Sequence, residues 1–118
     1  MQRELRLTER RQFSSVQRQG RGWSNQLLVL KAAPNGLEGN RYGFSVGRRV
    51  GIAVVRNRVK RRLREVARLA RVKAGWDMVF IARGAAASAE YHELRDAAVG
   101  LLARARLLEG DAAAGGQR

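Results

Sequence analysis

The sequence predicts one α/β domain whose helices and strands follow the order α-β-β-α-β-α. Two kinds of pattern carry this prediction. In three segments apolar residues recur every three to four positions, as they do on one face of a helix. Three shorter segments are aliphatic throughout or alternate between apolar and polar residues, as strands do. The length of 118 residues suits one domain with a substantial core and is too short for two.

The first predicted helix begins at Thr8, whose hydroxyl can cap it, and runs to about Gln19. Two glycines follow and stop it. The first strand is the aliphatic run 26–32, and the second is 41–47, where apolar and small residues alternate. The loop between them holds the only proline and an Asn-Gly pair, so the chain reverses there. If that loop is a simple hairpin, the two strands pair antiparallel.

A long helix is predicted from about residue 53 to 73, with Gly75 ending it. Its apolar stripe consists of Val59, Leu63, Val66 and Ala70. Segment 56–64 holds six cations among nine residues and no acid, and no acidic residue lies between positions 38 and 65. Ordinary solvated helix faces mix acids with bases. We therefore interpret this helix as a surface for a polyanion, whose cations can be neutralised without leaving a cavity in the core.

The last two elements complete the domain. Segment 76–82 is apolar at nearly every position, which predicts a central strand, and a loop at 83–87 follows it. Ser88 is the expected cap of the last helix, whose apolar stripe runs from Tyr91 to Leu108. We expect the domain to span residues 1–108 and the tail 109–118 to be disordered.

Composition narrows the partners. The formal charge is +14, from 24 Lys and Arg against 10 Asp and Glu, which is typical of a protein that binds nucleic acid or an anionic membrane surface. Only three of the cations are lysines; arginine binds phosphate through two N–H groups and stacks on bases, which favours nucleic acid. The absence of cysteine suits the cytoplasm. No apolar segment approaches the ~20 residues of a membrane span, so we expect no membrane partner.

Residues that could carry catalysis or bind metal are scarce. His92 is the only histidine, and with Asp96 four positions later it makes a weak metal signal, so a solvated surface histidine is the better interpretation. No nucleophile motif, phosphate loop or paired zinc motif occurs. We predict no catalytic residue and no metal ligand in this chain. Aromatic residues that could stack on bases do lie beside the cations, namely Phe13, Tyr42 and Phe44, although each is individually better suited to a core.

Residues 44–65, F-S-V-G-R-R-V-G-I-A-V-V-R-N-R-V-K-R-R-L-R-E, closely resemble the protein subunit of bacterial ribonuclease P. The Arg-Asn-Arg signature of that family matches Arg56, Asn57 and Arg58. Segment 7–20 is similar to its first helix, and segment 77–86 is similar to its last strand and the following loop. The resemblance covers about the first hundred residues.

The resemblance implies a two-layer α/β sandwich with a small central sheet and a left-handed β-α-β crossover, although handedness rules alone favour the opposite hand. It also implies a function. The protein would bind the catalytic RNA of ribonuclease P, while a cleft between the sheet and the first helix would hold the 5′ leader of precursor tRNA. Cleavage that frees the mature 5′ end would belong to the RNA, with Mg²⁺ held mainly by that RNA. The protein would thus be a subunit of an endoribonuclease and inactive alone.

The resemblance carries over to individual positions. Phe13 matches the aromatic residue that contacts the leader. Where many members have a second aromatic one turn later, this sequence has Gln17, so a sheet aromatic, Tyr42 or Phe44, is expected to take that part. The expected contacts to the catalytic RNA are Arg48, Arg49, Arg56, Asn57, Arg58, Lys60, Arg61, Arg64 and Arg68.

Two other interpretations stay open at this point. A structural RNA-binding protein of the ribosomal type would share the sandwich and the basic helix but would need no exposed aromatic in a cleft. A DNA-binding helix-turn-helix protein is less well supported, because nothing before residue 56 resembles the supporting helix and tight turn. We therefore expect RNA and not DNA as the partner.

Overall fold

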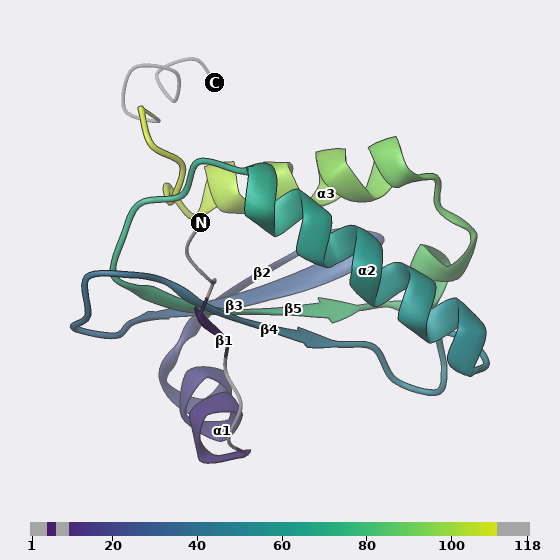
Figure 1. Ribbon diagram of the computed structural model, residues 1–118, viewed down its shortest axis with the longest axis horizontal. Helices are drawn as coiled ribbons and strands as arrows, with labels where there is room; N and C mark the ends of the chain where they lie inside the picture. Colours follow the sequence, from purple (N-terminus) through teal and green to yellow (C-terminus); the bar gives the residue numbers. More distant parts are fainter. Residues whose placement is uncertain (1–4, 7–9, 111–118) are drawn as a thin grey trace.

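A computed structural model of the chain describes residues 5–6 and 10–110, of which the side chains of 5–6, 10–13 and 19 are not described. One mixed sheet has the strand order β1-β4-β5-β3-β2. Helices α2 and α3 cover one face of the sheet and α1 lies against the other (Figure 1). The bounds are β1 Leu5–Arg6, α1 Arg10–Gln19, β2 Arg21–Ser24, β3 Leu28–Pro34, β4 Arg41–Ser45, α2 Ala53–Leu69, β5 Trp76–Ala82, the 3₁₀ helix η1 Gly84–Ser88, and α3 Tyr91–Arg104.

The predicted central strand is confirmed, because β5 lies between β3 and β4. Alternate residues of β5 point to opposite faces. Met78 and Phe80 enter the main core beneath α2 and α3, whereas Val79 meets Val16 of α1 on the other face. A strand buried on both faces needs apolar residues at nearly every position, which is the pattern the sequence shows.

The predicted hairpin between the first two strands is wrong. β3 and β4 do not pair; β5 separates them, antiparallel to β3 and parallel to β4. The loop from 35 to 40 passes across the end of β5, where the Asn40 side-chain oxygen accepts from the Trp76 backbone N–H at 2.8 Å and the Asn35 N–H donates to the Gly75 oxygen at 2.8 Å. Burying the most apolar strand in the centre outweighs the local preference of a short loop.

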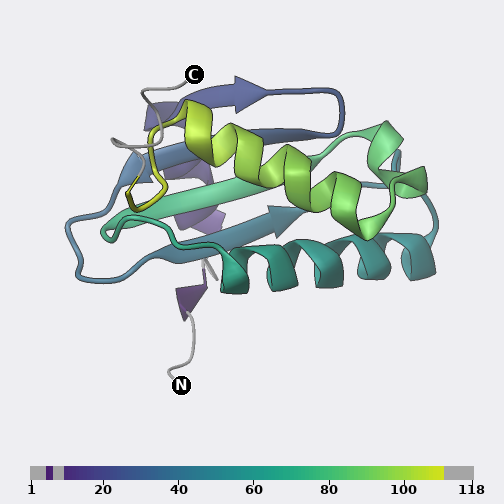
Figure 2. The ribbon, with the colours of Figure 1, turned by 90° about the horizontal axis from the view of Figure 1, so that it is seen from above.

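The expected left-handed crossover is present. Figure 2 looks at the sheet from the side of α2 and α3: β4 runs to the right, α2 returns to the left in front of the sheet, and the parallel strand β5 then lies above β4 in the picture. This hand is rare among parallel β-α-β units.

Helix α2 ends earlier than predicted, at Leu69 and not near residue 73. Beyond it the chain becomes extended and pairs with the segment that follows α3. Val72 forms a β-bridge with Leu108, and the Lys73 N–H donates to the Leu107 oxygen at 2.7 Å. Gly75 lies at the turn into β5 with a φ of +94°, a conformation that favours glycine. Pairing with a distant segment therefore replaces the last helical turn.

Three further details differ from the sequence-based expectation. The short strands β1 and β2 were not predicted, and the first long strand lies at 28–34, two residues later than expected. Ser88 ends η1 in place of the predicted loop and does not cap α3. The cap of α3 is Glu90, which forms a capping box with Glu93. Thr8 and residues 111–118 lie outside the described residues, so the proposed first cap and most of the proposed tail stay predictions.

Candidate RNA-binding surfaces

Helix α2 is amphipathic as predicted. Val59, Leu63, Val66 and Ala67 are buried in the core between α2 and the sheet. The opposite side of the helix, together with the turn before it, faces solvent. Within the predicted RNA-binding set, the exposed members are Arg48, Arg49, Asn57, Arg61 and Arg68. The half-buried members are Arg56, Arg58, Lys60 and Arg64.

Two arginines of α2 hold the neighbouring loop. The Nη2 of Arg58 donates to the Ala87 oxygen at 3.0 Å, and the Nη1 of Arg62, one turn later, donates to the Ala89 oxygen at 3.1 Å. Both carbonyls belong to the segment at the end of η1. These two side chains therefore fasten η1 to α2. Arg62 was not among the predicted site residues, because nothing in the sequence places residues 87–89 beside this helix.

Two other cations of the predicted set have partners within the protein. The Arg68 guanidinium forms an ion pair with Glu65 at 2.7 Å on the exposed side of the helix. The Arg64 guanidinium carbon lies 6.0 Å from the ring centre of Phe44, a cation–π distance. The cations of α2 are thus divided between those that stay free for an anion, with Arg61 the clearest case, and those that already contact protein groups.

The predicted leader residues Tyr42 and Phe44 lie on the face covered by α2 and α3. Their rings stack 6.3 Å apart, and Phe44 stacks on the core residue Phe80 at 6.2 Å. The expectation that one of them shares a cleft with α1 is therefore corrected. Both residues occupy even positions of β4, and in a strand alternate side chains point to opposite faces. Their neighbours Gly43 and Ser45 occupy the positions that face α1.

The face of the sheet that packs α1 carries residues that the sequence pattern did not single out. Val16 of α1 is buried against Val79, with Ile81 beside them. By register, Val29 is paired with Ile81 and Lys31 with Val79, so Val29 and Lys31 lie on this same face. The available signal was a lysine at an odd position of an otherwise aliphatic strand. Gln17 on α1 is exposed, and the side chain of Phe13 is outside the described residues.

Gly20, which follows α1, allows the helix to approach the sheet closely. A Cβ atom added at this position would lie 2.8 Å from the Ala32 oxygen, too near for any other residue. Its N–H donates to the Val16 oxygen at 2.7 Å and completes the helix end. The position of α1 on the sheet face therefore depends on this glycine.

The buried ion pair at the other end of the sheet fixes β4 to β5. Asp77 is only 7% exposed and accepts two hydrogen bonds from Arg41, at 2.8 and 2.7 Å, and one from the Asn35 amide at 3.0 Å. Burial by itself raises the pKa of Asp77, but the hydrogen bonds from Arg41 and Asn35 and the Arg41 charge together outweigh it, and the pKa is lowered.

Among the described residues no three His, Cys, Asp or Glu side chains come together as metal ligands would. His92 is exposed on α3, and Asp96 is paired with Arg95 at 3.1 Å. Within the same part of the chain no helix is both long and apolar enough to cross a membrane.

Comparison with known proteins gives a consistent result. The sequence profile of the family described as Ribonuclease P matches residues 1–106. The ribonuclease P protein component of Dehalococcoides mccartyi is 46% identical over 108 residues, covering 92% of this chain and 90% of that protein. The same component from Roseiflexus castenholzii is 45% identical over 113 residues and covers 93% of each.

The fold is also similar to solved structures. The ribonuclease P protein from Thermotoga maritima superimposes with a TM-score of 0.78 and 31% sequence identity, covering 86% of this chain and 97% of that one. The mixed sheet with helices on both faces is therefore common to this chain and to that protein.

Proposed function

The chain belongs to the ribonuclease P protein family, and from this premise we propose that it binds the catalytic RNA of ribonuclease P and the 5′ leader of precursor tRNA. A protein component of ribonuclease P is a subunit of an endoribonuclease that works with an RNA partner. In the proposed complex this subunit promotes cleavage at the 5′ end of tRNA.

The observation that carries the proposal is the acid-free band of cations on α2 and on the turn before it. Arg48, Arg49 and Arg61 are exposed there, and no acidic residue occurs between positions 38 and 65. Like charges this close repel one another, and phosphate groups would relieve that repulsion. Each phosphate neutralised also releases counterions, so binding of this kind weakens steeply with salt.

We propose the α1 side of the sheet for the leader. Val29 supplies an apolar surface and Lys31 a cation on that face, while Gln17 is exposed on α1 beside it. Phe13 stays a proposed stacking residue of the same helix. An aromatic or aliphatic surface with a cation suits single-stranded RNA, because every base has a face to stack and every nucleotide a phosphate.

In this proposal the protein has no catalytic residue. Its cations screen repulsion between the phosphates of the two RNAs, and its α1 side orients the leader so that the scissile phosphodiester reaches the active site of the RNA. Mg²⁺ ions, held mainly by the RNA, supply the chemistry of hydrolysis when bound. The protein works in the cytoplasm, with no DNA or membrane partner.

Reconstitution tests the proposal. The repurified protein, the catalytic RNA and a precursor tRNA are combined at low magnesium, and 5′ maturation is followed over time. We expect the protein to accelerate cleavage by the RNA and to be inactive alone. A structural RNA-binding protein of the ribosomal type would bind RNA without accelerating cleavage, and cleavage by the protein without RNA would contradict the assigned roles.

A further inference from the structure

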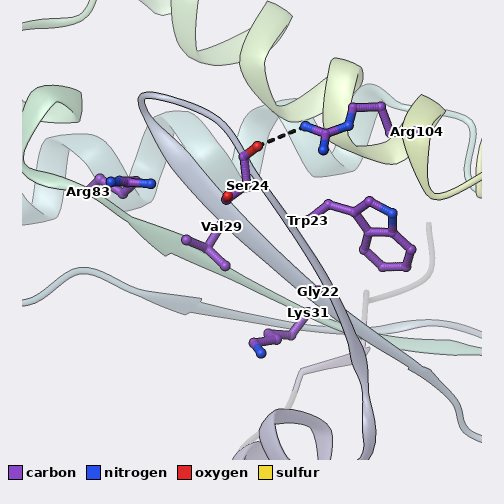
Figure 3. Close-up of a pocket in the computed structure, with 7 residues that line it drawn as sticks. All are labelled: Gly22, Trp23, Ser24, Val29, Lys31, Arg83 and Arg104. Atoms are coloured by element: carbon purple, nitrogen blue, oxygen red, sulfur yellow. Dashed lines mark hydrogen bonds between the residues drawn. The ribbon is translucent and has the colours of Figure 1, made fainter.

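A pocket of about 480 Å³ lies beside the edge strand β2, away from helix α2. It is lined by Gly22, Trp23, Ser24, Val29, Lys31, Arg83 and Arg104 (Figure 3). Its volume is in the range of pockets that hold small ligands. Three of the seven residues are cations from three different elements, and none is acidic. A group of cations without acids attracts an anion.

The two arginines are held in place by the turn after β2. The Nη1 of Arg104 donates to the Ser24 oxygen at 2.8 Å, and the Nη1 of Arg83 donates to the Asn25 oxygen at 3.2 Å. One N–H group of each is used in this way, and a guanidinium has five. Both arginines are exposed. They can therefore bind an anion at little further cost in side-chain freedom.

The turn that holds them is itself fixed. The Asn25 side-chain oxygen accepts from the N–H groups of Leu27 and Leu28 at 3.1 and 2.9 Å, and its amide donates to the Ala97 oxygen of α3 at 3.0 Å. The Arg83 N–H donates to the Leu27 oxygen at 2.8 Å. The carbonyls of Ser24 and Asn25 thus have a defined position between β5 and α3, and so do the guanidinium groups on them.

Trp23 and Lys31 complete the pocket. The indole of Trp23 is half-buried, and the Arg21 guanidinium lies over it at 5.6 Å from the ring centre. Lys31 extends across Gly22: a Cβ atom at Gly22 would lie 3.2 Å from its Nζ. The pocket therefore combines cations for a phosphate with an aromatic surface for a base, which are the two parts of a single-strand nucleotide site.

We infer that this pocket binds one unpaired nucleotide of RNA, with its phosphate on Arg83, Arg104 and Lys31 and its base against Trp23. The pocket is separate from the basic helix, which lies over the opposite edge of the sheet (Figure 2). The inference rests on the proposed function only for the source of the nucleotide. An outer nucleotide of the leader and an unpaired nucleotide of the catalytic RNA have the same chemistry.

Trp23 fluorescence tests the pocket without any ribonuclease P RNA. The chain has two tryptophans, so Trp76→Phe leaves Trp23 as the only emitter. Titration of that variant with a short oligouridylate should quench the emission saturably. Added Arg104→Gln or Arg83→Gln should weaken this binding severalfold, whereas Arg95→Gln, the same charge change on α3 outside the pocket lining, should not. Unchanged emission, or equal effects of all three substitutions, would overturn the inference.

A second measurement identifies the source. In the otherwise native chain, Trp23→Leu should weaken the affinity for RNA by about five- to a hundredfold, and Trp23→Phe by less, as expected for loss of one stacking partner. Precursor tRNAs with leaders of increasing length, mature tRNA and the catalytic RNA alone are compared, with a thermal melt of each variant. A loss confined to long leaders assigns the leader, and a loss confined to the catalytic RNA assigns that RNA. No loss for any RNA by a folded variant refutes the site, even if wild-type protein accelerates cleavage.

Discussion

The Nη2 of Arg58 lies 3.0 Å from the carbonyl oxygen of Ala87 and donates a hydrogen bond to it. This arginine belongs to the Arg-Asn-Arg signature, and the sequence suggested that its charge could be removed without harm to the fold. Its contact with η1 shows otherwise. The basic helix contains side chains that hold the protein together beside side chains that are free for RNA.

Arg61 and Arg62 offer a matched pair for testing this division. Arg62→Gln removes the hydrogen bond to the Ala89 oxygen and should lower the free energy of unfolding by about 1 kcal/mol. Arg61→Gln makes the same change on the exposed side and should stay within about 0.5 kcal/mol of wild type. Denaturant melts measure both. Hydrogen exchange at residues 84–90 should rise only in the Arg62 variant, and equal melts would refute the tether.

Salt dependence of RNA binding separates arginines that bind phosphate from arginines that tether the fold. Neutralising the three exposed cations Arg48, Arg49 and Arg61 together should flatten the plot of log affinity against log salt by roughly 0.7 to 0.9 for each phosphate that the variant no longer neutralises. The fold should be unaffected, since none of the three is buried. An unchanged slope with the catalytic RNA would mean that this surface does not meet phosphates.

Phe13 is expected to act on leader-bearing RNA alone. Phe13→Ala should weaken binding of precursor tRNA by about 1–3 kcal/mol, the cost of removing one stacking partner, and leave mature tRNA nearly unchanged. Affinities for the two RNAs are measured beside a denaturant melt. If Phe13 serves the core, the melt should shift by roughly 3–5 kcal/mol and both RNAs should lose affinity equally.

Phe44 should behave in the opposite way. Its ring stacks on Phe80 on the face covered by α2 and α3, away from α1. Phe44→Ala should therefore lower stability by roughly 3 kcal/mol or more and reduce binding of both RNAs only through loss of folded protein. A selective effect on precursor tRNA, with a normal melt, would return Phe44 to the leader site.

Asp77 should make stability depend on acid pH. Its pKa is lowered in the folded protein, so its stabilising contribution is present above the ordinary pKa near 4 and is lost as pH falls through the lower folded value. Asp77→Asn should cost about 1–3 kcal/mol at pH 7, because Arg41 loses its partner. It should also flatten the stability profile below about pH 4. A variant that keeps the wild-type acid profile would contradict this assignment.

Much of the fold follows from local pattern. The apolar spacing of Val59, Leu63 and Val66 identified the buried side of α2, and the unbroken apolar run of β5 identified the central strand. The acid-free cluster of cations indicated a polyanion as the partner. Each of these depends on neighbours along one element, so periodicity alone reveals it.

What the tertiary structure decided depends on contacts between distant segments. The pairing of Val72 with Leu108 shortened α2, and the insertion of β5 separated β3 from β4. Strand alternation gave Tyr42 and Phe44 to the core face and Lys31 to the α1 face, but only the packed helices determine which face is which. Likewise, the charge of Arg62, Arg83 and Arg104 is evident from the sequence, whereas their partners are backbone carbonyls 27 or more residues away, which any residue type could provide.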